Sequence, residues 1–144
     1  MSTETKMENP IPQGKYVPAN RAGNLIYSAG MTPRVNGVLL LTGKVKASEP
    51  LESYRNAVRQ AAANALTAVR NALTEGESIA KIVTMSVFIQ AEEGYTTHAK
   101  LADFASDYLC EQLGDRGIVS RAAIGVASLP GDAPVEIQLV AVAE

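Results

Sequence analysis

The last strand-like segment, VEIQLVAVA over residues 135–143, constrains the fold most, because both of its faces carry apolar residues. Successive side chains of a strand point to opposite faces of its sheet. One face is wholly apolar and comprises Val135, Ile137, Leu139 and Ala141. The other face is half apolar and comprises Glu136, Gln138, Val140 and Val142. A strand with one solvated face shows a clean apolar–polar alternation, so this segment needs cover on both sides.

Other strands are predicted at residues 24–29, 79–90 and 121–128. The segment IAKIVTMSVFIQ at 79–90 is rich in β-branched residues and indicates a central strand. We expect it to place Ile82, Thr84, Ser86 and Phe88 on one face and Val83, Met85, Val87 and Ile89 on the other. Segment 121–128 and the final strand are expected to form an antiparallel hairpin across the turn at 129–134. Asn36-Gly37 predicts another hairpin within 34–41, because both positions tolerate a positive φ.

Two helices complete the predicted set of elements. Apolar residues recur at helical spacing from Leu51 to Leu73, with Ser48 as an N-cap candidate and Gly76 as the end. The second helix follows Thr96 or Thr97 and closes at Gly114. Its inner face comprises Leu101, Phe104, Ala105, Tyr108, Leu109 and Leu113, with Cys110 packed beside Leu109.

The order of elements predicts an α/β (α+β) domain with one mixed sheet and two helices on one face. We expect a single domain over residues 1–144, with 1–14 as an extended N-terminal arm. Two helices leave the second sheet face uncovered. Self-association in a closed ring would cover it, whereas the alternative is a monomer with a fully buried last strand.

Charge and cysteine content limit the partners and the compartment. The chain has 13 Lys and Arg against 15 Asp and Glu, a net charge of -2, and no basic stripe. We therefore do not expect nucleic acid as a partner. The single Cys110, the polar N-terminus and the absence of a long apolar run favour a cytoplasmic protein that does not enter membranes.

Two charged residues stand out in the last two strand-like segments, Arg121 and Glu136. The planar guanidinium of arginine suits bidentate binding of a carboxylate, and a glutamate can exchange a proton or orient a water. An oligomer seam could bring these two residues together as a site. The alternative is a simple ion pair at an interface.

Three stretches resemble successive signatures of the Rid family, the YjgF-like reactive-intermediate imine deaminases. They are GNLIYSAGMTP, AAANAL and SRAAIGVASLPGDAPVEIQLVAV. The last is the most specific, since it joins Arg and small residues to a Leu-Pro turn and Val-Glu-Ile. The resemblance runs from about Lys15 to the end of the chain. It favours a subgroup with a longer approach to the second helix, here EEGYTTHAKLADFASDYL.

The resemblance implies a chorismate-mutase-like fold and a homotrimer whose sheets form a central barrel with clefts between subunits. It implies hydrolysis of an enamine or imine such as 2-aminoacrylate to a 2-keto acid and ammonia, without a metal or organic cofactor. Arg121 would hold the substrate carboxylate and Glu136 would help place the water. The other positions that the resemblance assigns to the cleft are Tyr16, Gly30, Met31, Phe88, Asp103 and Ala123.

Four positions depart from the family pattern, namely Ala29, Met31, Asp103 and Ala123. They make the expected cleft more apolar and, at Asp103, more acidic. Two alternatives to the deaminase therefore remain. One is a noncatalytic trimer that binds a small carboxylate or a protein partner in the same clefts, and the other is the ribonuclease activity attributed to some relatives.

Overall fold

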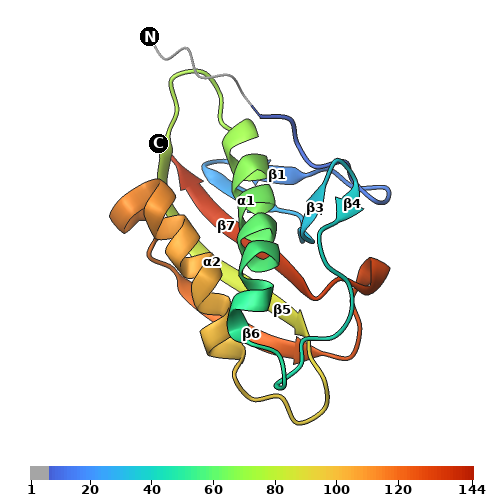
Figure 1. Ribbon diagram of the computed structural model, residues 1–144. Helices are drawn as coiled ribbons and strands as arrows, with labels where there is room; N and C mark the ends of the chain where they lie inside the picture. Colours follow the sequence, from blue (N-terminus) through green and yellow to red (C-terminus); the bar gives the residue numbers. More distant parts are fainter. Residues whose placement is uncertain (1–6) are drawn as a thin grey trace.

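The computed structural model describes residues 7–144, so the first six residues of the expected arm lie outside the described residues. A five-stranded mixed sheet has the strand order β1-β2-β7-β5-β6, and helices α1 and α2 both lie on one of its faces (Figure 1). This arrangement confirms the predicted α+β class. The strands of this sheet are β1 (Ala19–Ala22), β2 (Leu25–Ser28), β5 (Ile79–Gln90), β6 (Ser120–Val126) and β7 (Val135–Ala143).

The final strand β7 is central, between β2 and β5, and antiparallel to both. Every second residue from Val135 to Ala143 is buried under the helices, as predicted. The prediction of a hairpin between β6 and β7 is wrong. Strand β6 instead pairs in parallel with β5, because α2 forms the crossover that a parallel pair requires.

Strand β5 does not alternate as simply as its sequence predicts. Its register against β7 shifts between Ile82 and Thr84, as at a β-bulge. Ile82 is fully buried together with Met85, Val87 and Ile89, so it does not share a face with Thr84. A bulge inserts one unpaired residue and thereby reverses the alternation beyond it.

The start of the sheet differs from the prediction in two ways. Strand β1 was not predicted, and it pairs with β2 at one sheet edge. The predicted hairpin exists as β3 (Arg34–Val35) and β4 (Val38–Leu39), with φ values of 53° at Asn36 and 81° at Gly37. It forms a separate two-stranded sheet and is not part of the main one.

The first helix begins later and ends earlier than predicted. A short 3-10 helix, η1 (Leu51–Tyr54), precedes α1 (Arg55–Asn71), so Ser48 is not the N-cap. The second helix, α2 (His98–Leu113), follows Thr97 and ends at Gly114, which has a φ of 61°. Its buried residues include Leu101, Ala105, Leu109 and Leu113, but Cys110 is exposed, so its predicted packing is wrong.

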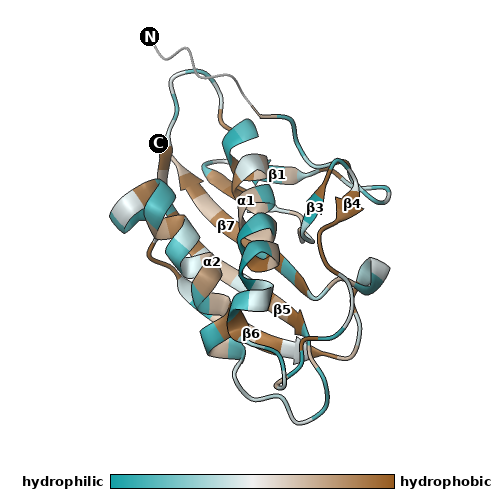
Figure 2. Cartoon of the chain, viewed as in Figure 1, coloured by the Kyte–Doolittle hydropathy of each residue, from teal (hydrophilic) through white to brown (hydrophobic). Residues whose placement is uncertain are grey.

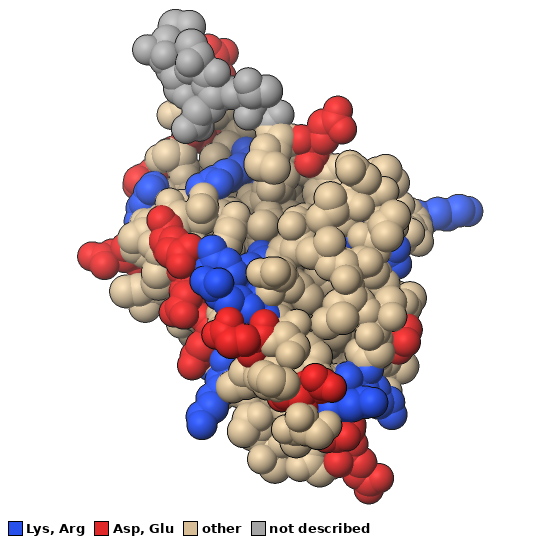
Figure 3. Space-filling view, in the orientation of Figure 1, with Lys and Arg blue, Asp and Glu red and all other residues tan. Residues whose placement is uncertain are grey.

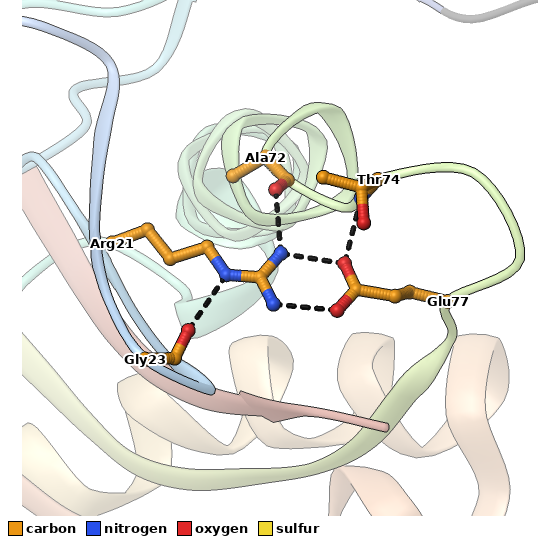
Figure 4. Close-up of polar contacts among 5 residues, drawn as sticks. All are labelled: Arg21, Gly23, Ala72, Thr74 and Glu77. Carbon is orange, nitrogen blue, oxygen red and sulfur yellow. Dashed lines mark hydrogen bonds and ion pairs between the residues drawn. The ribbon is translucent and has the colours of Figure 1, made fainter.

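A polar cluster fastens the β1–β2 turn to the end of α1 (Figure 4). Arg21 donates from Nε to the Gly23 carbonyl at 2.9 Å and from Nη1 to the Ala72 carbonyl at 3.1 Å. Both of its Nη groups also bond the Glu77 carboxylate, which accepts the Thr74 N–H at 2.7 Å. These hydrogen bonds hold the pKa of Glu77 well below its usual range. The cluster satisfies a carbonyl that the helix end leaves without an intrahelical partner.

The second face of the main sheet has no helix over it. In Figure 2 the outer sides of α1 and α2 are largely hydrophilic, with apolar strands behind them. Beyond those strands, Leu25, Tyr27 and Ile124 are 39%, 43% and 48% exposed. The structure thus leaves an apolar sheet face open, as the sequence predicted. Within residues 7–144, neither helix has the length and apolarity needed to cross a membrane.

Candidate active site

A hollow of about 520 Å³ lies on the uncovered sheet face, where β1, β2 and β7 meet the segment before β1. Its walls combine aromatic rings with polar side chains. The lining residues are Tyr16, Val17, Asn20, Tyr27, Ser28, Ala29, Gly30, Pro130, Glu136 and Gln138. The hollow thus contains three of the predicted site residues, Tyr16, Gly30 and Glu136.

Glu136 is the acidic group of the hollow, and its carboxyl lies against the backbone of Gly30. A Cβ on Gly30 would approach the Glu136 Cδ to 2.8 Å and its Oε2 more closely still. Only glycine leaves room for the carboxyl in this position. Burial raises the pKa of Glu136. Desolvation of this kind is typical of carboxyls that exchange protons, although structural carboxyls also show it.

The polar wall of the hollow is held by its own hydrogen bonds. Gln138 donates from Nε2 to the Ser28 carbonyl at 3.1 Å. The Ser28 hydroxyl donates to the Ala29 carbonyl and accepts the Leu139 N–H, both at 2.9 Å. Groups fixed in this way need little reorganisation when a ligand binds.

The rim of the hollow includes Tyr16, whose side chain is about half exposed. Its hydroxyl accepts the Gln13 N–H at 3.0 Å and keeps its own proton to donate. Phe88 on β5 is the cross-strand partner of Glu136 and lies beside it on the same face. Unlike Tyr16 and Phe88, Met31 lies in the core, where it is only 6% exposed. Its backbone forms two hydrogen bonds with Ile137, which fixes the chain next to Gly30.

Arg121 lies on the opposite face of the sheet from Glu136. Its guanidinium donates from Nη1 to Asp103 Oδ1 at 2.9 Å and to Ser106 Oγ at 3.0 Å, and from Nη2 to the Ala99 carbonyl at 3.2 Å. All three acceptors belong to α2. Ala123 follows on the same face and packs against the core.

The predicted site residues therefore fall into two groups in one chain. Tyr16, Gly30 and Glu136 share the hollow, with Phe88 alongside, whereas Arg121 and Asp103 form an ion pair between β6 and α2. Within one chain Arg121 and Glu136 do not pair, because they lie on opposite faces of the sheet and Asp103 bonds the guanidinium. An ion pair between the two at an interface stays a prediction.

Several polar residues of the hollow were missed in the sequence, chiefly Asn20, Ser28 and Gln138. Gln138 carried a signal, since it follows Glu136 by two positions and so shares its face. Asn20 gave none, because β1 was not recognised. In the part of the chain that the structure describes, no three His, Cys, Asp or Glu side chains are placed to hold a metal ion.

Comparison with known proteins identifies relatives of this chain. A family model described as endoribonuclease L-PSP matches residues 6–143. Protein TCP17 of Trypanosoma cruzi is 28% identical over 127 residues, which cover 88% of this chain and 79% of that protein. The crystal structure of Atu1372 from Agrobacterium tumefaciens, of unknown function, has a TM-score of 0.84 at 30% identity and covers 93% of this chain and 86% of that one.

The YjgF gene product of E. coli shares the fold. Its crystal structure has a TM-score of 0.68 at 22% identity, covering 97% of this chain and 98% of the other. A likeness at this identity concerns the fold alone. It agrees with the chorismate-mutase-like architecture expected from the sequence.

Proposed function

Because this chain belongs to the endoribonuclease L-PSP family, which includes the YjgF and Rid proteins, we propose that it hydrolyses small imine or enamine carboxylates to 2-keto acids and ammonia. One observation carries the proposal. The half-buried carboxyl of Glu136, with its raised pKa, lies against Gly30 inside a hollow large enough for a small substrate. This arrangement suits a group that takes a proton from water and returns it.

The reaction requires little from the protein beyond positioning the water and the imine carbon. Protonation of an enamine by solvent at its terminal carbon gives the iminium, whose carbon is electrophilic. Glu136 accepts a proton from the attacking water while the new C–O bond forms. The protonated carboxyl then returns this proton to nitrogen, which gives a carbinolamine with a protonated amine. Glu136 next accepts the hydroxyl proton as the C=O bond forms and the C–N bond breaks, and ammonia and the 2-keto acid leave. Holding the water and the imine carbon in contact supplies most of the acceleration.

Arg121 enters this proposal from a second subunit. Within one chain it lies across the sheet from Glu136, so the same chain does not bring both to one substrate. Strand β6 is a sheet edge, and Ile124 is exposed there on the open face that carries the hollow. We propose a homotrimer in which the β6 edge of one subunit closes the hollow of the next, so that Arg121 holds the substrate carboxylate.

The test is the release of ammonia from freshly generated 2-aminoacrylate. We expect acceleration over solvent hydrolysis, and a loss of about 10²- to 10⁴-fold in kcat/KM for Glu136→Gln. Glu93→Gln, at an exposed glutamate, serves as the matched control and should keep full activity. The acid limb of the wild-type pH profile should lie above the ordinary glutamate pKa of about 4.3, because burial raises the pKa of Glu136. Equal rates for Glu136→Gln and wild type would end the proposal.

A noncatalytic carboxylate-binding trimer is the second candidate. The placement of Arg121 and Glu136 on opposite faces of one chain favours it, because no carboxyl with a raised pKa then lies beside the guanidinium. Binding of 2-ketobutyrate without accelerated ammonia release would support this candidate. Ribonuclease activity has weaker support, since basic and acidic side chains are interspersed on the helix face and the net charge is -2 (Figure 3).

A further inference from the structure

The ion pair between Arg121 and Asp103 joins β6 to α2. The Arg121 side chain is only 20% exposed, whereas that of Asp103 is 61% exposed. Ser106 Oγ and the Ala99 carbonyl also accept from the guanidinium, so its position does not depend on Asp103 alone. Arg121 is fixed, and Asp103 presents much of its carboxylate to solvent.

Each member of the pair keeps unused hydrogen-bonding capacity. An arginine has five N–H donors, and three hydrogen bonds engage Arg121 among the described residues. Its Nε–H and one N–H of Nη2 have no partner there. Asp103 accepts through Oδ1, and its Oδ2 has no partner among residues 7–144. The pair therefore offers free donors on Arg121 and a free anionic acceptor on Asp103, joined through the bond between Nη1 and Oδ1.

This combination disfavours a ligand that is only an anion. A plain carboxylate on Arg121 would meet the negative charge of Asp103 at close range, and like charges repel at such distances. A ligand with a carboxylate and a neighbouring protonated nitrogen meets no such penalty, since its cation can bond the free oxygen of Asp103. Bonds of this charge-assisted type are roughly twice as strong as neutral ones.

We infer that Asp103 selects zwitterionic substrates, namely α-iminium carboxylates, over simple carboxylates and 2-keto acids. The substrate carboxylate binds the free N–H groups of Arg121, and its protonated nitrogen binds Asp103. The product keto acid lacks the cation and is released more readily. This inference rests on the proposed function, in that it takes Arg121 as the carboxylate holder.

Calorimetric titration with L-alanine and propionate tests the inference, because the two probes differ only by the ammonium group. Wild-type protein should bind L-alanine about tenfold more tightly than propionate, the ratio expected for one charge-assisted hydrogen bond. Asp103→Asn should weaken L-alanine and strengthen propionate, so that the preference disappears or reverses. Asp107→Asn, at an exposed acidic residue one turn further along α2, should leave both affinities unchanged.

Arg121→Ala separates a failure of the role of Asp103 from a failure of the proposed carboxylate holder. If it abolishes binding of both probes but Asp103→Asn changes both affinities equally, Arg121 holds carboxylates and the role of Asp103 is wrong. If Arg121→Ala binds both probes like wild type, or wild type binds neither, the proposed carboxylate holder is wrong as well. Loss of the L-alanine preference in Asp103→Asn alone, with thermal stability unchanged, is the result we expect.

Discussion

Gly30→Ala should disable the site without unfolding the protein, because the new methyl group would occupy the space of the Glu136 carboxyl. The added Cβ would lie 2.8 Å from the Glu136 Cδ and closer to Oε2, well inside van der Waals contact. Gly30 does not have a positive φ, so alanine suits its backbone. The strain must therefore be relieved by the side chain of Glu136.

The expected size of the effect follows from that movement. Rotating the Glu136 side chain off its preferred conformation costs about 0.5–1.5 kcal/mol, so thermal unfolding should shift only slightly. A displacement of about 1 Å in a catalytic group can reduce the rate by 10²-fold, and we expect a fall in kcat/KM of this order. Ammonia release and calorimetric unfolding measure the two quantities on the same preparation.

A second background checks the cause. In Glu136→Ala protein the carboxyl is absent, so adding Gly30→Ala should change stability by close to zero. If Gly30→Ala destabilises both backgrounds equally, the methyl group clashes with something other than Glu136. If Gly30→Ala keeps wild-type activity, the reaction does not require the Glu136 carboxyl to lie against the Gly30 backbone.

Three further predictions concern stability and assembly. Glu77→Gln should flatten the acid limb of the stability profile, because a carboxyl with a lowered pKa contributes stability at neutral pH that is lost as the pH falls below about 4; chemical unfolding from pH 7 to 3 measures this. Leu109→Ala should lower the free energy of unfolding by about 2–5 kcal/mol, whereas the exposed neighbour Cys110→Ala should change it by less than about 0.5 kcal/mol, as urea titration would report. Ile124→Glu on the open sheet face should convert the proposed trimer to monomers in sedimentation, while Val38→Glu, 68% exposed on β4, should leave it intact; a trimeric Ile124→Glu would exclude this face from the interface.

Local patterns in the sequence were sufficient for the two helices, for the turn between β3 and β4, and for the strands β2, β5, β6 and β7. The bounds of β5 and β7 agree with the prediction because both are long and apolar, and the turn at Asn36-Gly37 has the predicted positive φ values. Strand β1 carried no such signal, since ANRA is short and polar and is held mainly by its pairing with β2. The start of α1 was misplaced because Ser48 has the chemistry of a cap but lies before the 3-10 turn.

Arg121 and Glu136 are predicted from the sequence as candidate site residues, but the sequence does not show how the two side chains lie relative to one another. Both lie in strands along which successive side chains point to opposite faces, so the sequence predicts which neighbours share a face with each of them. Only the tertiary structure decides whether Arg121 and Glu136 lie on the same face of the sheet. The crossover through α2 sets β6 parallel to β5, and Arg121 thereby turns under the helix to meet Asp103, while Glu136 opens into the hollow on the other side. Strand order depends on contacts between distant segments, which no local pattern encodes, and for that reason the partner of Arg121 appeared only in the folded chain.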